Sequence, residues 1–277
     1  MKHTILIFCI ALLAAAPLAG QTAFRSPLPE AAKGDRLFSQ EKYKEALGEY
    51  KKLPASAESR KRLGAVYIKL WNMSEAIAAL RDAVNRAPHD SEAGTLLAEA
   101  LSWDGKLREA LDIYRGLLGK GEDTAELRLG YARTLSWNKD VNGALEQYRL
   151  ATRGYPRNLD AHMGLAEMLS WKKRFDQSIA AYRRVLDLTD VSAYKSVALT
   201  RIAKVLTWKG DMDAAEAHYR QAIHADGTNV DALFGLGELN EWSGEYREAK
   251  SWYQKILQVQ PDHKGAKAKL LQLMWVK

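Results

Sequence analysis

Apolar side chains recur along this chain at the spacing of amphipathic helices. They return at i, i+3, i+4 and i+7 in run after run, as at Leu97, Leu101, Leu107 and Leu111. This spacing places the apolar residues on one face of an α-helix. The runs are about three turns long, and helices of this length are marginally stable alone, so they must gain stability by stacking on neighbours. The pattern predicts an all-α chain of about fifteen helices.

The helical pattern is part of a sequence repeat. The segment LLAEALSWDGKLREALDIYRGLL (96–118) has relatives beginning 34 residues later at 130, then at 164, at 201 after a step of 37, and at 235. A divergent copy begins at 62 and a shortened one at 32. A fixed period of this length is typical of arrays built from one repeated supersecondary unit.

Three slots of the repeat keep the same kind of side chain. Position 8 is small and holds Gly34, Gly64, Ala98, Ala132, Ala166, Ala203 and Gly237. Position 20 is also small and holds Ala46, Ala76, Ala110, Ala144, Ser178, Ala215 and Ala249. Position 24 is large and holds Tyr50, Leu80, Tyr114, Tyr148, Tyr182, Tyr219 and Tyr253. Small residues at 8 and 20 allow two helices to approach closely, and the aromatic ring fills the remaining gap.

The spacing and these slots resemble the tetratricopeptide repeat family. That resemblance implies a right-handed α-solenoid of seven helix-turn-helix units over residues 27–263, with a Lys-rich capping helix at 264–277. The first unit is shortened. Three extra residues near 189–194 explain the 37-residue step, either as a bend in the array or as a neutral insertion, which surface loops tolerate well.

The N-terminus has the layout of a secretory signal peptide. Lys2 precedes an apolar run from Ile5 to Ala16, followed by Pro17 and small residues. We expect a signal peptide at 1–20 and a short linker at 21–26; an uncleaved anchor is the alternative, although the run is short for a membrane span. Cleavage would remove Cys9, the chain's single Cys, and leave a mature chain that we expect to be periplasmic or secreted, with no integral membrane span.

Composition and motifs indicate a binding protein rather than an enzyme. The formal net charge is +7, but acidic and basic residues alternate along the chain, so we expect no nucleic-acid partner. The chain has no GxxxxGK[ST], HExxH or GxSxG motif, and its six His residues are scattered. We therefore expect no catalytic residues, no metal site and no cofactor.

Five of the eight Trp residues occupy a single slot of the repeat, position 13. In tetratricopeptide repeats, positions 2, 5, 9, 12 and 13 of the first helix typically face the concave groove. The resemblance therefore implies a groove lined at position 13 by Trp103, Trp137, Trp171, Trp208 and Trp242, and at position 9 by Glu99, Arg133, Glu167, Lys204 and Glu238. Trp71 lies two residues out of this register, Trp252 is on a second helix, and Trp275 is in the cap.

Two interpretations of the Trp register stay open. The indoles could form a ladder that stacks on sugar rings or on apolar side chains of an extended ligand, since indole combines a large apolar area with one N–H donor. Each indole could instead pack against the next unit, as the interfaces of stacked repeats require. Solvent exposure of the five side chains separates these interpretations.

The Leu-Ser-Trp segments are also similar to tetratricopeptide segments of bacterial envelope proteins that act in exopolysaccharide export. This similarity implies an exported, non-enzymatic scaffold that binds an envelope protein or an extended peptide in its groove, in exopolysaccharide export or outer-membrane assembly. The alternative is a polysaccharide-binding module that uses the Trp ladder.

Overall fold

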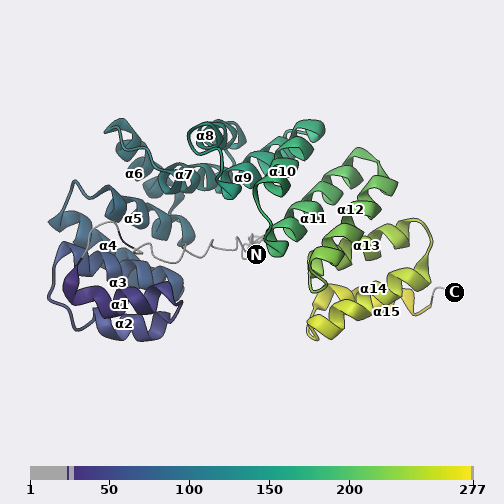
Figure 1. The fold of residues 1–277 in the computed structure, drawn as a ribbon, viewed down its shortest axis with the longest axis horizontal. Helices are drawn as coiled ribbons and strands as arrows, with labels where there is room; N and C mark the ends of the chain where they lie inside the picture. Colours follow the sequence, from purple (N-terminus) through teal and green to yellow (C-terminus); the bar gives the residue numbers. More distant parts are fainter. Residues whose placement is uncertain (1–23, 25–27, 276–277) are drawn as a thin grey trace, which may run out of the picture. The chain divides into compact units, whose positions relative to one another are not determined.

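The computed structural model describes residue 24 and residues 28–275, so the expected signal peptide at 1–20 lies outside the described residues. Within the described part of the chain the fold is all-α, as predicted, with fifteen α-helices and one short 3-10 turn, Pro29–Ala31 (Figure 1). The helices are α1 Ala32–Ser39, α2 Tyr43–Tyr50, α3 Ala57–Lys69, α4 Met73–Arg86, α5 Ser91–Trp103, α6 Leu107–Gly119, α7 Ala125–Trp137, α8 Val141–Gly154, α9 Leu159–Trp171, α10 Phe175–Leu188, α11 Ser192–Lys209, α12 Met212–Ala225, α13 Val230–Trp242, α14 Tyr246–Val259 and α15 Lys264–Leu273.

Most first helices of the repeats begin at a side-chain cap. The residue before the helix accepts a hydrogen bond from a backbone N–H of the first turn, and these caps are Ser56, Asp90, Thr124, Asn158 and Asn229. Such a cap satisfies one of the N–H groups that a helix start leaves unpaired. In the sixth unit the same slot holds Lys195, which cannot accept, and α11 begins earlier, at Ser192. The 37-residue step thus coincides with an 18-residue first helix, whereas α9 has 13 residues.

Each first helix ends in a left-handed turn at position 15. This residue has a positive φ in all seven units, and the set is Glu41, Trp71, Gly105, Lys139, Lys173, Gly210 and Gly244. The next N–H reaches back to the carbonyl of position 11, as from Lys106 to Leu101 at 2.9 Å, which pairs a carbonyl that the helix end leaves free. Glycine adopts this conformation without strain, whereas other residues do so at a cost.

The core is built from the three slots that the sequence singled out. The residues at position 20 are fully buried in every unit, and the Tyr side chains at position 24 are at most 7% exposed. The Gly34 backbone lies directly against the ring of Tyr50, so that a Cβ at this position would come within 2.5 Å of the ring. Tyr114, Tyr148 and Tyr219 also reach position 6 of the following first helix, where they lie against Gly130, Gly164 and Gly235.

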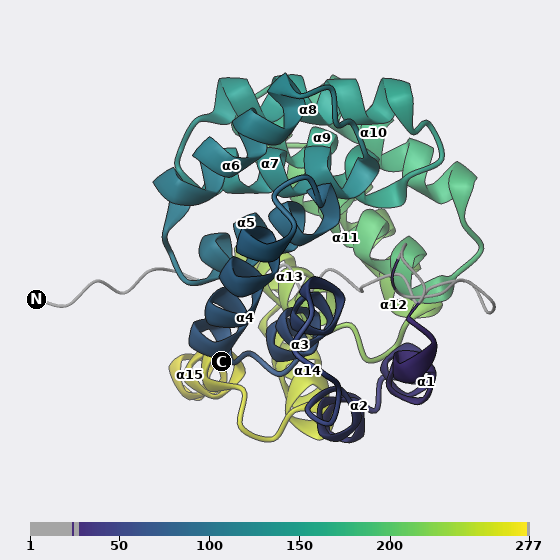
Figure 2. The same cartoon turned by 90° about the vertical axis from the view of Figure 1, so that its left-hand side faces the viewer.

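The chain divides into two compact parts, residues 1–147 and 148–277, with the boundary inside α8. These parts are called unit 1 and unit 2 below, and each contains several helix-turn-helix repeats. Unit 1 contains α1 to α7, and consecutive helices pack side by side as antiparallel hairpins (Figure 2). Unit 2 contains α9 to α15 in the same arrangement (Figure 1). We describe the two units separately.

The C-terminal helix α15 covers the last repeat. Its Ala266 and Leu273 are buried with Leu233, Tyr253 and Ile256 of α13 and α14, while its exposed face carries Lys264, Lys267 and Gln272 together with Leu271. Over the described residues, no helix combines the length and the hydropathy that a membrane crossing requires.

Candidate functional site

The in-register indoles lie at the ends of the first helices α5, α7, α9, α11 and α13, and none of them is buried. Trp171, Trp208 and Trp242 are 50%, 58% and 63% exposed. Trp103 and Trp137 are partly exposed. The face formed by the first helices therefore presents accessible indole surface in both units.

In unit 1 the indoles contact one another. The rings of Trp103 and Trp137 lie 4.6 Å apart between centroids and are tilted by 58°. Trp71 adds a third ring, 5.2 Å from Trp103 at 73°, although it follows the end of α3 and is out of register. The edge-to-face geometry of Trp71 and Trp103 stabilises aromatic pairs. These contacts cross from one repeat to the next.

Glu99 and Arg133, at position 9 of two successive repeats, both act on the buried Tyr114. Burial raises the pKa of the Tyr114 hydroxyl, Glu99 on α5 raises it further, and Arg133 on α7 opposes that rise. The hydroxyls of Ser102 on α5 and Thr134 on α7 share a hydrogen bond of 2.8 Å between the same two helices. The structure thus brings Glu99, Arg133, Trp103 and Trp137 together on two adjacent helices.

In unit 2 the next pair of indoles encloses a pocket instead of a ring contact. The pocket between Trp171 and Trp208, named here the 171/208 pocket, is lined by Glu167, Ser170, Trp171, Tyr182, Arg201, Lys204, Val205 and Trp208. Four of the ten residues predicted from sequence therefore meet at one site, contributed by α9 and α11, with Tyr182 of α10 also lining it.

Burial perturbs the charged groups of the 171/208 pocket. It raises the pKa of the Glu167 carboxyl, although the positive charge of Arg201 acts in the opposite direction. It lowers the pKa of the Lys204 ammonium, which Asp231 partly offsets through an ion pair of 3.4 Å. The pocket therefore holds desolvated charges between two indole walls, an environment in which polar contacts are stronger than in water.

The last two predicted residues, Glu238 and Trp242, lie on α13 beside the C-terminal helix. Burial raises the pKa of Glu238, and Lys269 of α15 acts in the opposite direction. Its neighbour Glu241 pairs with Lys269 at 2.5 Å. Burial also raises the pKa of Tyr219 to about 12.

Sequence reasoning missed two residues of this face. Trp71 was set aside because it is out of register, yet it joins the row because the position-15 turn carries it next to Trp103. Arg201 was overlooked because position 6 had no assigned role, and a comparison of position 6 across the seven units would have found it.

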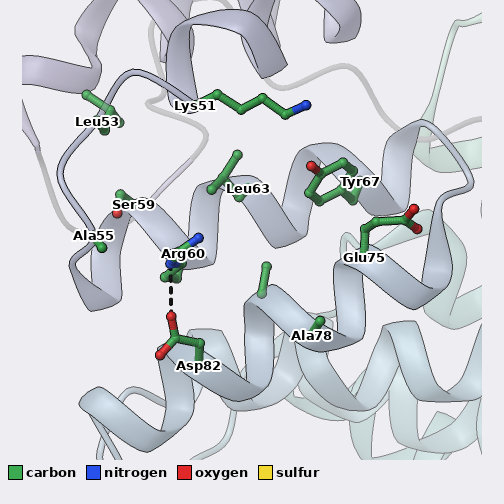
Figure 3. Close-up of a pocket in the computed structure, with 11 residues that line it drawn as sticks. Lys51, Leu53, Ala55, Ser59, Arg60, Leu63, Tyr67, Glu75, Ala78 and Asp82 are labelled. Atoms are coloured by element: carbon green, nitrogen blue, oxygen red, sulfur yellow. Dashed lines mark ion pairs between the residues drawn. The ribbon is translucent and has the colours of Figure 1, made fainter.

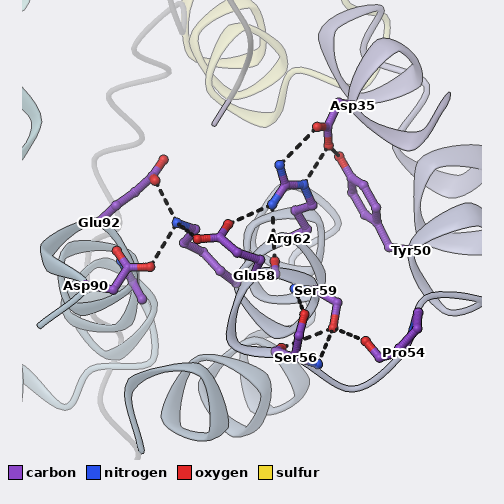
Figure 4. A network of polar contacts seen from close by, with 11 residues as sticks. Asp35, Tyr50, Pro54, Ser56, Glu58, Ser59, Arg62, Asp90 and Glu92 are labelled. Atoms are coloured by element: carbon purple, nitrogen blue, oxygen red, sulfur yellow. Dashed lines mark hydrogen bonds and ion pairs between the residues drawn. The ribbon is translucent and has the colours of Figure 1, made fainter. Parts of the chain in front are cut away.

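A buried charge network lies at the N-terminal end of unit 1 (Figure 4). Arg62 is fully buried and bonds Asp35 with two nitrogens, at 2.9 and 3.1 Å, and Glu58 at 2.8 Å. Lys61, 1% exposed, pairs with Glu58, Asp90 and Glu92 at 2.9 to 3.1 Å. Burial alone would lower the pKa of Lys61, but the hydrogen bonds that its ammonium donates to Asp90 and Glu92 raise it overall. The network ties α1, α3 and α5 together.

Another pocket lies elsewhere in unit 1 and contains none of the predicted residues. It has a volume of about 520 Å³ and lies between the segment after α2 and helices α3 and α4, with Leu53, Leu63 and Tyr67 facing it (Figure 3). Arg60 and Asp82 form an ion pair of 2.9 Å at its wall. Helix α2 has 8 residues where α4 has 14, so this pocket is the gap left by a shortened second helix.

Metal-ligating side chains do not gather in the described part of the chain. No group of three His, Cys, Asp or Glu side chains there is arranged to hold a metal ion.

Comparison with solved structures returns other tetratricopeptide arrays. A chain of the APC/C hetero-tetramer Cut9–Hcn1 matches 88% of this chain at 13% identity and a TM-score of 0.68, and this chain spans 47% of it. PilF of Pseudomonas aeruginosa matches 78% of this chain and 95% of its own at 18% identity and 0.63. YrrB, described as a tetratricopeptide repeat protein with an unusual peptide-binding site, matches 70% and 98% at 20% identity and 0.52. Identities this low show the fold alone.

Comparison with curated proteins finds no match. Two family models, both described as tetratricopeptide repeat, do match: one at residues 37–100 and 209–272, the other at residues 138–193. Together they cover about two thirds of the sequence. With seven helix-turn-helix units and a closing helix, the chain belongs to the tetratricopeptide repeat family.

Proposed function

We propose that this protein is a scaffold that binds an extended segment of a partner protein along the face formed by its first helices. The observation that carries the proposal is the 171/208 pocket, where two half-exposed indoles stand beside the partly buried Glu167, Arg201 and Lys204. Apolar walls with a few fixed polar groups are the usual composition of a site that binds specifically.

The chemistry of this face suits a polypeptide. Indole surface takes up apolar side chains, and the charged and hydroxyl groups beside it can bond backbone amides or polar side chains. The peptide-binding site named for YrrB is consistent with such use of a tetratricopeptide array.

We further propose that the scaffold works after export, in the periplasm or outside the cell, with an envelope protein as its partner. Support comes from the sequence alone: the charged, apolar and small-residue order of residues 1–20, and the resemblance of the Leu-Ser-Trp segments to envelope proteins of exopolysaccharide export. A role in exopolysaccharide export or outer-membrane assembly rests on the same resemblance.

A polysaccharide is the second candidate ligand, because Trp171, Trp208 and Trp242 expose half or more of their surface. The indoles of unit 1 argue against it. Trp71, Trp103 and Trp137 are tilted by 58° and 73° against one another, so they present edges rather than a flat row of ring faces. A sugar ring stacks on the face of an aromatic side chain, and unit 1 offers few such faces.

The test is a capture experiment with matched variants. The chain, Trp171→Ala/Trp208→Ala and Trp275→Ala are each immobilised and exposed to an envelope extract. Trp275 lies beyond α15 and is 85% exposed, so its variant controls for loss of an indole elsewhere. We expect one protein to be retained by the unchanged chain and by Trp275→Ala and lost from the double variant. Equal retention by all three, or none by folded bait, contradicts the proposal.

The polysaccharide alternative has its own readout. Neutral glucan and an acidic polyuronate are titrated while Trp emission is followed. A saturable change that the double variant abolishes, without any protein retained from the extract, would assign the face to polysaccharide.

A further inference from the structure

A trio of side chains occurs twice in this array, once in each unit. It consists of an acidic residue at position 9, the Tyr at position 24 of the same repeat, and an Arg at position 6 of the next. In unit 1 the trio is Asp35, Tyr50 and Arg62. In unit 2 it is Glu167, Tyr182 and Arg201. Arg holds position 6 only in these two repeats; the other first helices carry Ala32, Leu96, Gly130, Gly164 and Gly235.

In unit 1 the trio is closed and covered by an aromatic side chain. Arg62 bonds Asp35, and the Tyr50 hydroxyl donates to the same carboxylate at 2.8 Å (Figure 4). Phe24, 2% exposed, stacks on the Arg62 guanidinium at 4.6 Å and contacts the rings of Phe38 and Tyr50 at 5.5 and 6.2 Å. The chain itself therefore shows what fills this site: an aromatic ring.

In unit 2 the same trio is open. Among the residues that the structure describes, no side-chain hydrogen bond or ion pair joins Glu167 to Arg201, although their charges interact. In place of a covering ring, the structure has the 171/208 pocket.

The surroundings of the two sites correspond position by position. Phe24 lies in one apolar cluster with Tyr50, Val66 and the partly buried Phe38, which hold positions 24, 10 and 12. The 171/208 pocket is lined by Tyr182, Val205 and Ser170 at those same positions. Ser170 is smaller than Phe38, and the indoles of Trp171 and Trp208 supply the apolar surface that this exchange removes.

We propose that the 171/208 pocket binds an aromatic side chain presented by an extended segment of the partner protein, as Phe24 is bound in unit 1. The pocket has a volume of about 30 Å³ in the free chain, so the exposed indoles of Trp171 and Trp208 must turn aside to admit the ring over the Arg201 guanidinium. This inference rests on the proposed function and specifies which type of partner side chain the 171/208 pocket binds. Stacking on a guanidinium and on aromatic walls favours a planar ring over an aliphatic chain.

Charge argues against the two other occupants. A cationic side chain would meet Arg201 and Lys204 on the same wall. Lys204 is already paired with Asp231, so an acidic side chain would compete with Glu167 for Arg201, and the two like charges would repel at close range. A neutral ring meets neither penalty.

The probe is a peptide with the sequence of residues 21–30, QTAFRSPLPE, labelled with a fluorophore, together with variants that carry Ala, Leu, Glu or Lys in place of the Phe. Binding to the full chain is measured by fluorescence anisotropy. We expect the Phe peptide to bind about tenfold or more tightly than the Ala peptide, the gain expected for burying a phenyl ring. A benzophenone at the Phe site should crosslink to residues of α9 or α11.

Variants of the protein test whether the preference for the Phe peptide depends on Arg201. Arg201→Met keeps the stem of the side chain and removes the charge, and should weaken the Phe peptide by roughly threefold to tenfold, the range of a partly desolvated cation–π contact. Arg184→Met, on an exposed side chain of α10, makes the same change outside the pocket and should have no effect.

Each other outcome overturns the inference in a distinguishable way. Equal binding of all five peptides leaves a peptide-binding face but no aromatic pocket. Preference for the Glu or the Lys peptide assigns the pocket to a charged side chain. Absence of binding by every peptide at millimolar concentration rejects the aromatic pocket, and the proposed scaffold function is then judged separately by the capture experiment.

Discussion

The residues at position 15 are the places where the backbone of this chain is strained. All seven residues there have positive φ, but only three are glycine. Lys139→Gly and Lys173→Gly should each raise the free energy of unfolding by about 0.5–1 kcal/mol, because glycine relieves left-handed strain that exceeds its own entropic cost. Thermal unfolding checks this prediction. Gly105→Ala in the same slot serves as the reverse control and should destabilise; a gain there would contradict the strain argument.

Trp71 occupies the same strained slot, so Trp71→Gly is informative by comparison. It gains the same backbone relief but loses the edge-on contact with Trp103, worth about 0.5–1.5 kcal/mol. The two terms nearly cancel, and we expect a stability close to that of the unchanged chain. This indole can therefore be removed to test binding without unfolding the array.

The buried carboxyl of Glu167 predicts a stability that depends on pH. Its pKa is raised in the folded state, so the folded chain holds this proton more tightly, and stability falls as pH rises from the ordinary Glu pKa through the raised one. Glu167→Gln cannot ionise. At pH 7 it should raise the free energy of unfolding by about 1 kcal/mol, and near pH 4 the difference should vanish.

Urea unfolding at the two pH values checks the Glu167 prediction. Glu248→Gln, on an exposed side chain of α14, is the matched control and should change little at either pH. A variant at Glu167 that is less stable at pH 7 would mean that attraction to Arg201 outweighs the burial of the carboxylate.

At the scale of elements, the caps explain why the helices begin where they do. Asn158→Ala should destabilise by about 1 kcal/mol, because the N–H of Ala161 loses its 2.9 Å acceptor. Arg174→Ala, at the start of α10, removes a residue that makes no side-chain cap and should have little effect. Equal losses in the two variants would show that the Asn158 bond contributes nothing.

The helices and their partners could be predicted from the sequence, because the small and aromatic slots encode how the two helices of a unit pack. Contacts between side chains of different repeats could not. Trp103–Trp137 and Trp171–Trp208 look alike in the sequence, yet one pair touches and the other encloses a pocket. The pair that encloses a pocket is also the pair with Arg201 at position 6 and a longer α11. Neither feature changes the 3.6-residue spacing of apolar side chains, so the sequence pattern does not reveal the difference.

The site was predicted in part for the same reason. Repeat register is sufficient to place Glu167, Trp171, Lys204 and Trp208 on adjacent helices, since every first helix presents the same face. The closed trio at Arg62 and the aromatic cover supplied by Phe24 depend on a residue outside the repeat, in a segment that the sequence suggested was a linker.

At the scale of the whole molecule, stability in such an array is carried by contacts between neighbours, so damage should stay local. Gly130 and Gly164 hold the same position 6 in units 1 and 2, and each lies against a Tyr ring, Tyr114 and Tyr148. A methyl group at either site overlaps that ring, so Gly130→Ala and Gly164→Ala should each destabilise by about 1–3 kcal/mol. Gly116→Ala, in open space on α6, should instead stabilise by roughly 0.5–1 kcal/mol.

Hydrogen exchange under native conditions shows how far each effect spreads. Because stability is carried by neighbouring contacts, Gly130→Ala should speed amide exchange mainly in α5 to α7, and Gly164→Ala mainly in α8 to α10. Uniform acceleration along the chain in both variants would mean that the array opens as one cooperative body. A local response would mean that the 171/208 pocket can adjust to a partner while the buried charge network of unit 1 stays folded.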